Sequence, residues 1–345
     1  MALEPASFYR DPRVNMTVLH DTPFLADDED LRDSDGSHVR LMVLKATFEI
    51  GKNGNLTPSE NQRPIAAGPV WLGEPGRSSL IEDGDWALKK PSADIAIVGH
   101  IRPPHCQPVR QLLARFSIGH WTKTVRVVGD RPILAGAFTM QVGDPLPFTS
   151  MPIMWERSFG GTSADGRQHR CNPIGRGLVD RKDLEDADGR FMPNFENPEL
   201  PSRINGGEST GLGFIDCGWE PRIHYAGTYD EDWIRHRMPL FPKDFDHRFF
   251  NASPPDMVYP GHLKGGEIGL LEGCCPDGPL KFTLPRMSVY FAGKRRSGIF
   301  ECEAVMDTLL LDLDRLCLSC VWRAKVAIAA NEREYDVRAE VTLQD

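Results

Sequence analysis

The chain has 345 residues and a formal net charge of −9, with 40 lysines and arginines against 49 aspartates and glutamates. Hydrophobic residues make up 40% and charged residues 26%, as in ordinary globular proteins, so disorder over most of the length is excluded. The acidic balance argues against a nucleic-acid partner, because the phosphate backbone would repel the protein.

The segments that would place the protein in or across a membrane are missing from the sequence. No apolar run reaches the ~18 residues of a membrane-spanning helix, and the first residues lack the apolar core of a signal peptide. We therefore expect a cytoplasmic protein without membrane insertion. Eight cysteines do not indicate a disulfide scaffold in a protein of this length, and we expect reduced thiols.

Turn residues are frequent. The sequence has 32 glycines and 28 prolines, above the average share of about 12% for the two together. This excess favours many short strands joined by turns over long helices.

The first part of the sequence begins with an acidic run and continues with strand patterns. The run at residues 27–35 indicates a solvated loop in an N-terminal segment, 1–38, that is partly irregular. Residues 39–50 alternate between apolar and polar and predict a strand. Residues 94–99 are apolar without alternation, which is typical of a strand buried on both faces. Residues 112–128 contain two apolar-rich arms around Gly-His-Trp-Thr and predict a hairpin.

The middle third, from residue 151 to about 285, has little regular periodicity. One helix is indicated there, beginning at a capping box formed by Thr228 and Glu231 and ending before Pro239. A long irregular segment inside a compact protein is often functional. We expect a rigid loop region that packs on itself.

Strand patterns return near the C-terminus, at residues 282–291 and 308–343. Within the second range, the sequence predicts that Cys320–Ile328 and Tyr335–Leu343 pair as an antiparallel hairpin around Asn331, preceded by a strand at Asp307–Asp312. The expected fold is mainly β, with an antiparallel β-sandwich-like frame, a long irregular insertion and few short helices. Residues 39–345 are expected to form one domain.

Cys317 and Cys320 have the spacing of a CxxC motif. Three residues apart on a strand, their side chains point to opposite faces, and no second CxxC supplies the other ligands of a zinc site. We expect no metal and no cofactor.

Carboxylates in the middle third could supply a general acid and base, for example Glu156 with Asp230, and a hydrolase is the alternative function. The same residue types in turn-rich sequence cap backbone N–H groups and pair with arginines such as Arg157 and Arg248. We therefore expect a structural polar network and no catalytic residue. The expected network consists of Glu156, Arg157, Arg176, Asp230, Asp244, Asp246 and Arg248.

The middle third also carries long sequence blocks: PIMWERSFGGT (152–162), CNPIGRGL (171–178), MPNFENP (192–198) and a block over 211–256. In these blocks, and in ADIAIVGH and KTVRVVGDRP upstream, the protein resembles the domain-of-unknown-function-2169 family over about residues 15–325. The structural or partner-binding residues that we single out are Trp155, Glu156, Arg157, Phe159, Gly160, Gly161, Asn172, Pro173, Gly175, Arg176, Gly177, Asp230, Trp233, Asp244, Asp246, Arg248, Phe249, Phe250 and Asp256.

This resemblance implies an adaptor or chaperone of the type VI secretion system. Such a protein binds a secreted effector, in some cases through a PAAR-like domain, stabilises it and helps to load it on the spike complex. The resemblance brings neither catalytic residues nor a cofactor, and it leaves the oligomeric state open.

Overall fold

In the computed structural model, the described residues are 18–136, 139–180, 187–295, 298–328 and 336–343. The fold is mainly β, with 42% strand and 8% helix, as the sequence predicts. Several sheets are antiparallel and the helices are few and short. Among the described residues, no helix has both the length and the apolar character needed to cross a membrane.

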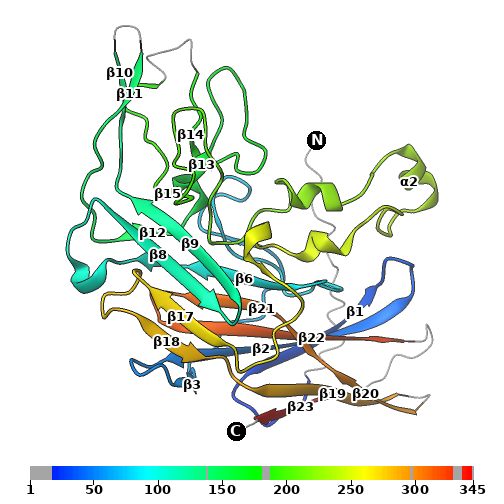
Figure 1. The fold of residues 1–345 in the computed structure, drawn as a ribbon. Coiled ribbons are helices and arrows are strands. Elements are labelled where there is room, and N and C mark those ends of the chain that lie inside the picture. Colours follow the sequence, from blue (N-terminus) through cyan, green and yellow to red (C-terminus); the bar gives the residue numbers. More distant parts are fainter. Residues whose placement is uncertain (1–17, 137–138, 181–186, 296–297, 329–335, 344–345) are drawn as a thin grey trace.

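The largest sheet has seven strands and forms the centre of the molecule (Figure 1). Its order is β1 (Leu25–Arg32), β2 (His38–Ile50), β22 (Cys317–Ala327), β21 (Val305–Asp312), β6 (Ala93–Val98) and β16 (Val258–Tyr259), with β3 (Leu56–Pro58) also paired to β2. Neighbouring strands are antiparallel except β6 and β21, which run parallel. The sheet joins the two ends of the sequence, because β2 pairs with β22 over eleven residues.

Two further sheets pack on one face of this central sheet and complete a sandwich (Figure 1). One has the order β15 (Phe195–Glu196), β9 (Trp121–Val128), β8 (Gln111–Ile118), β17 (Ile268–Glu272), β18 (Leu280–Thr283), and the other has β20 (Gly298–Glu303), β19 (Met287–Arg295), β23 (Asp336–Leu343). Ile95 and Leu309 of the central sheet meet Phe116 and Phe282 of the five-stranded sheet. Burial of this apolar surface contributes about 25 cal/mol per Å² to stability.

The strands expected at 39–50 and 94–99 are confirmed as β2 and β6, and all six residues of β6 are buried. The hairpin expected within 112–128 is confirmed as β8 and β9, with Ile118 opposite Trp121 at the turn. The turn residue Gly119 has a φ of 56°, a backbone conformation that glycine adopts without strain.

The acidic run at residues 27–35 is largely a strand, and the loop expected there is wrong. β1 pairs with β2 over its full length, with Asp28 opposite Met42 and Asp30 opposite Arg40. Arg40 neutralises the carboxylates, at 3.1 Å from Asp28 and 2.8 Å from Asp30. Acidic composition indicated solvation, but the cross-strand arginine outweighs it.

The C-terminal strands exist, but their expected pairing is wrong. β22 forms its hairpin with β21 and also pairs with β2, whereas β23 pairs with β19 in another sheet. The reason is burial: Ser319 and Arg323 lie on the polar face of β22 and are buried like its apolar face, so β22 is a central strand. The strand expected at 282–291 is divided between β18 and β19, and Pro285 lies between them. The expected turn at Asn331 lies outside the described residues.

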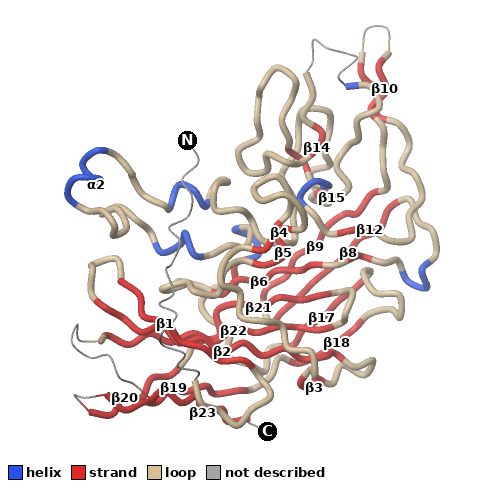
Figure 2. The backbone as a smooth tube through the Cα atoms, turned by 180° about the vertical axis from the view of Figure 1, so that it is seen from behind, coloured by secondary structure: helices blue, strands red, loops and turns tan. Residues whose placement is uncertain are grey.

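The irregular region ends before the expected residue 285, because β16, β17 and β18 at 258–283 belong to the sheets of the sandwich. The described residues ahead of these strands form two projections from the sandwich (Figures 1 and 2). The lobe is made of the described residues between 131 and 210, and the arm is residues 221–250. The remaining short elements are β4 (Val70–Trp71), β5 (Leu80–Glu82), β7 (His100–Ile101), η1 (Pro104–Cys106), β10 (Ile133–Ala135), β11 (Met140–Val142), β12 (Met151–Pro152), η2 (Trp155–Arg157), β13 (Phe159–Gly160), β14 (Arg176–Gly177), η3 (Arg222–Tyr225), α2 (Glu231–His236), η4 (His247–Phe250) and η5 (Pro255–Met257).

The second face of the central sheet is buried, as the sequence indicated for residues 94–99, but it also carries charge, which the sequence pattern did not indicate. Lys45 on β2 donates to Asp85 at 2.8 Å, and Lys90 donates to Asp94 on β6 at 2.7 Å. Arg323 on β22 pairs with Asp307. The two lysine pairs hold the segment 59–90 over the sheet, whereas the Arg323–Asp307 pair links β22 to β21 within it. They stabilise the fold while intact, and breaking one side of a buried pair typically costs about 3–5 kcal/mol.

Candidate functional site

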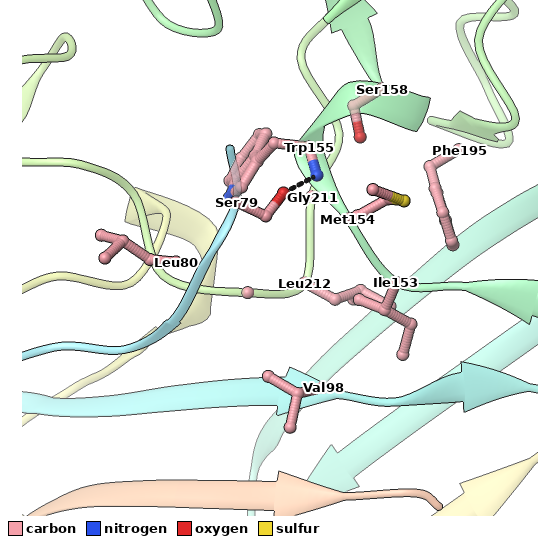
Figure 3. A pocket seen from close by; sticks show the side chains of 11 residues that line it. Ser79, Leu80, Val98, Ile153, Met154, Trp155, Ser158, Phe195, Gly211 and Leu212 are labelled. Carbon is pink, nitrogen blue, oxygen red and sulfur yellow. Dashed lines mark hydrogen bonds between the residues drawn. The ribbon is translucent and has the colours of Figure 1, made fainter. Parts of the chain in front are cut away.

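The lobe joins the sandwich at Trp155, which is buried in η2. Its indole N–H donates to the Phe214 carbonyl at 2.7 Å, and its backbone N–H donates to Ser79 Oγ at 2.6 Å (Figure 3). The ring also meets the edge of Trp219, with centroids 5.8 Å apart. Trp155 therefore fixes three separate stretches of the backbone against one another.

Glu156 is engaged by the same serine. One carboxylate oxygen accepts from the Ser79 backbone N–H at 3.0 Å and the other accepts from the Ser79 hydroxyl. Both interactions are local to the junction between β5 and η2. The cavity beside Trp155, lined also by Val98, Ile153 and Leu212 (Figure 3), has a volume of about 10 Å³, which is room for one water molecule. Glu156 thus holds a loop in place beside a cavity too small for a substrate.

The glycine-rich blocks are in backbone contact. A Cβ on Gly160 would lie 2.2 Å from the Asn172 carbonyl oxygen, and one on Gly161 would lie 2.4 Å from the Gly175 carbonyl oxygen. Asn172 is fully buried and donates to the carbonyls of Trp155 and Phe159, at 2.9 and 3.1 Å. Glycine is required at 160 and 161 because nothing larger fits the approach.

This docking positions neighbouring residues of the motif. Phe159 lies opposite Arg176 and Gly160 opposite Gly177 in the parallel pair β13–β14. The Pro173 carbonyl accepts from Thr162 at 3.3 Å. The two blocks form one rigid unit that presents the Arg176 side chain.

Arg176 and Arg157 meet at Asp130, whose Oδ1 accepts from both guanidinium groups at 3.1 Å. Asn194 also donates to this carboxylate at 3.0 Å and accepts from Arg157 at 2.9 Å. Burial acts to raise the pKa of Asp130, but the Asn194 hydrogen bond and the two arginines outweigh it, so the pKa lies below its ordinary value. Asp130 is therefore ionised at neutral pH.

A second carboxylate, Glu196, completes the group. It is fully buried and accepts from Arg131 at 2.5 Å and from Arg126 Nε at 3.0 Å. We call the set Arg126, Arg131, Arg157, Arg176, Asp130, Glu196 and Asn194 the arginine cluster. Because it contains four guanidinium groups and two carboxylates, it carries an excess of positive charge in an acidic protein.

The arm has a core of aromatic rings. Phe241 and Phe245 stack with centroids 4.2 Å apart, and Phe245 also contacts Phe249 and Phe250 at 5.6 and 5.5 Å. Arg222, at the base of the arm, lies 5.3 Å from the Phe249 ring centre. Such ring contacts are worth about 0.5–1.5 kcal/mol each beyond the area buried. They give the arm a shape of its own although it contains little regular structure.

The polar motif residues of the arm are used inside it. Asp230 caps α2 by accepting from the Trp233 N–H at 2.9 Å, so the capping box expected at Thr228 is wrong. Thr228 instead donates to Asp244 at 2.7 Å. Asp246 caps η4 by accepting from the Arg248 N–H, and it pairs with the Arg248 guanidinium at 2.6 Å.

Apolar side chains remain on the outside of the arm. Ile234 is 55% exposed and Met238 is 59% exposed, with Tyr229 at 40% and Ile223 at 45%. Tyr229 packs on Trp233, with ring centroids 4.7 Å apart. We call Ile223, Tyr229, Ile234 and Met238 the arm patch. Exposed apolar residues on a projecting element are typical of a protein-binding surface.

The motif residues therefore do not form one network. Arg157 and Arg176 lie together in the arginine cluster, while Asp230, Asp244 and Asp246 lie in the arm. Glu156 and Asp230, the proposed acid and base of a hydrolase, belong to different groups, and α2 lies at the end of the arm away from β13 (Figures 1 and 2). Asp256 is separate again, paired with Lys123 of β9.

Several residues of the site were missed. Asp130 and Arg131 follow β9 in the block KTVRVVGDRP, and Asn194 and Glu196 lie in MPNFENP. The signal was their place in the same blocks that carried the family resemblance. What the sequence could not show is that these blocks meet.

The cysteines of the CxxC motif are both buried in β22. Burial raises the pKa of Cys317 to about 11 and raises that of Cys320 further, so both are neutral thiols at neutral pH. Among the described residues, no group of three His, Cys, Asp or Glu side chains is arranged to hold a metal ion.

Comparison with known protein families identifies the family of this chain. The model of a family described as uncharacterized protein conserved in bacteria (DUF2169) matches residues 35–323. The chain belongs to this family, and the match includes the arginine cluster and the arm. Neither the curated proteins nor the solved structures gave a match.

Proposed function

We propose that this protein is a cytoplasmic adaptor of type VI secretion that binds an effector, stabilises it and helps to load it on the spike complex. The observation that carries the binding role is the arm patch, which exposes four apolar side chains on an element with its own aromatic core. The type VI context comes from the family resemblance and depends on it. The expected partner is the effector. One form of this partner contains a PAAR-like domain.

A preformed apolar surface suits this role because association is weakened by the ordering of mobile side chains. Helix capping by Asp230 and the Trp233 hydrogen bond to the Leu240 carbonyl at 2.8 Å hold α2 before any partner arrives. The polar motif residues of the arm are engaged within it, which leaves its apolar residues as the contact groups. When a partner covers them, a few anchor residues at the centre of an interface carry most of its binding energy.

The test is co-purification of this protein with a type VI effector from the same organism. We expect the double variant Ile234→Asp, Met238→Asp to lose the effector while it melts like the wild type, because both side chains are exposed and make no core contact. The matched control is Arg235→Gln on the same helix, where the exposed pair with Glu231 at 2.7 Å is worth little. Retention of the effector by the folded double variant would show that the arm patch does not bind it.

A further inference from the structure

The lobe contains a hollow beside the arginine cluster. It has a volume of about 310 Å³ and is lined by Thr162, Gly175, Arg176, Gly177, Leu178, Arg190 and Phe191. Its floor is the rigid unit of β14 and the glycine-rich blocks. One side is the ring of Phe191, which is partly exposed.

The Arg176 guanidinium at this hollow has fewer acceptors than it has N–H groups. Its Nη2 donates to Asp130, and its Nε is buried and has no hydrogen-bond partner among the described residues. Asp130 is shared with Arg157. A guanidinium offers five N–H donors, so Arg176 retains capacity for a further anionic group.

The charges around Arg176 also favour the binding of an anion. Arg157 and Arg131 lie close enough to act on it, and the cluster as a whole has two more positive than negative groups. Burial, together with the neighbouring Arg157 and Arg131, lowers the pKa of Arg176 to about 10 against the opposing effect of Asp130. The side chain is still charged at neutral pH, but it is held among like charges in a partly buried place. An added negative charge would relieve this repulsion.

We propose that the hollow binds a carboxylate of a partner protein, either that of an acidic side chain or the free α-carboxylate of a C-terminus. Arg176 is the principal ligand and the Phe191 ring is the apolar wall. That the carboxylate belongs to a bound effector rests on the proposed function, whereas carboxylate binding itself stands on the geometry of the hollow.

The guanidinium fork matches the planar carboxylate and binds it through two parallel hydrogen bonds. The Arg176 guanidinium also lies 5.8 Å from the centre of the Phe191 ring, so an entering group meets charge on one side and an apolar surface on the other. A peptide carboxylate brings aliphatic or backbone atoms that fit Phe191 and Leu178. Inorganic phosphate presents the charge without these atoms.

The test is calorimetric titration of the full-length protein at fixed salt with four probes. Two are acetyl-Gly-Leu-Gly with a free or an amidated C-terminus, the third is amidated acetyl-Gly-Glu-Gly, and the fourth is inorganic phosphate. We expect the free C-terminus, the glutamate peptide or both to bind and the amidated Leu peptide not to bind. The two binding arms separate a C-terminal carboxylate from an acidic side chain. Binding of phosphate without either carboxylate peptide would overturn the proposal, as would the absence of binding by all probes.

Variants locate the binding. Arg176→Gln should weaken the binding of the carboxylate probe at least about tenfold, as expected for a lost charge-assisted pair. Arg235→Gln, which removes the same charge from the arm, should leave it unchanged. Equal weakening by both variants would show general charge attraction and would sink the site.

Because Arg176→Gln also removes a partner of Asp130, Thr162→Tyr is the second variant. Thr162 is exposed at the edge of the hollow, and the larger ring should block entry without changing the arginine cluster. Undiminished binding by folded Thr162→Tyr contradicts the assignment. The titration uses the protein without its effector, so its failure leaves the co-purification result of the arm patch standing, and the reverse is also true.

Discussion

Asp28 is the residue whose environment departs most from what its sequence context indicates. It lies in the acidic run, but its side chain is 3% exposed and sits 3.1 Å from Arg40. Burial raises its pKa to about 6, with Arg40 acting in the opposite direction and the neighbouring carboxylates adding to the rise. At neutral pH the carboxylate is therefore ionised in a place that favours the protonated form.

Relative to the wild type, Asp28→Asn should raise the free energy of unfolding more at pH 7 than at pH 3.5. A folded pKa above the unfolded value means that the folded state binds the proton more tightly, so the wild type loses stability as the pH rises from about 4 through 6. Asn mimics the protonated form and removes this loss. With a shift of about two units, the effect of the substitution on the free energy of unfolding should differ by about 2–3 kcal/mol between the two pH values.

Denaturant unfolding at both pH values measures this difference. Asp35→Asn is the control of opposite sign, because hydrogen bonds from Ser37 lower the pKa of Asp35. Its variant should lose stability at pH 7 relative to pH 3.5. If Asp28→Asn changes stability equally at the two pH values, the pKa of Asp28 is not raised in the folded protein.

Some of this residue-scale detail could be predicted and some could not. Caps and tight turns are local, so acidic residues of the middle third were expected to hold backbone N–H groups, and Asp246 does so at η4. The cap of α2, however, is Asp230 and not Thr228. Contacts between distant segments were not readable. Glu156 binds Ser79, which lies 77 positions earlier in the sequence, and no spacing rule links such positions.

At the scale of elements, a buried arginine is one of the anchors of the arm. Arg222 donates from Nη2 to Asp83 at 2.7 Å, from Nε to the Phe249 carbonyl at 2.7 Å and from Nη1 to the Ile215 carbonyl at 2.9 Å. These bonds connect both ends of the arm to the segment that covers the central sheet. Its side chain is 5% exposed, so water does not replace the bonds when they break.

We expect Arg222→Ala to destabilise the protein by about 3–5 kcal/mol, the range for one side of a buried ion pair. Amide hydrogen exchange should show the largest loss of protection in residues 221–250, because their attachment to Asp83 and Ile215 is removed. Arg235→Ala is the matched control: its partner Glu231 is one turn away on α2 and the pair is exposed, so the change should be small. Equal exchange in the arm of wild type and Arg222→Ala would contradict the anchoring role.

Which strands pair with one another could not be predicted from the alternation of residues along each strand. The alternation of β22 and β23 identified two strands correctly, but alternation describes one strand at a time and contains no information on its neighbour. Arg323 and Lys325 lie on the polar face of this alternation. Asp307 and Asp33 neutralise them from other strands and loops, which allowed β22 a central place.

For the whole molecule, the sequence predicted a mainly β frame because the apolar face of each strand alternates regularly at both ends of the protein. The second face of the central sheet was hidden because its cover, residues 59–90, has almost no strand pattern. Lys90 reaches Thr308, 218 positions away, at 2.8 Å. A face built from such long-range pairs is specified by the assembled fold and not by any window of sequence.

As an adaptor, the whole molecule should control the amount of its partner. Binding the folded but not the unfolded effector raises the effector's stability by about 2.7 kcal/mol when the adaptor is in hundredfold excess over Kd. In cells such a change alters the abundance of a marginal protein several-fold. Deleting the gene should lower the effector protein while its transcript stays constant, as measured by immunoblot and transcript quantification. Unchanged effector level and secretion would refute the adaptor function.

Restoring the deleted gene as Glu156→Gln separates binding from chemistry. The amide retains an oxygen that can accept from the Ser79 N–H, the bond that Glu156 makes at 3.0 Å in the wild type, while it cannot act as a general acid or base. If the protein acts by binding, this variant should restore the effector level once its melting temperature shows that it folds. The arm patch lies on a different part of the molecule, so effector binding should also be intact. A folded Glu156→Gln variant that binds the effector but fails to restore function would favour the hydrolase, because the carboxylate would then be needed for something other than holding Ser79.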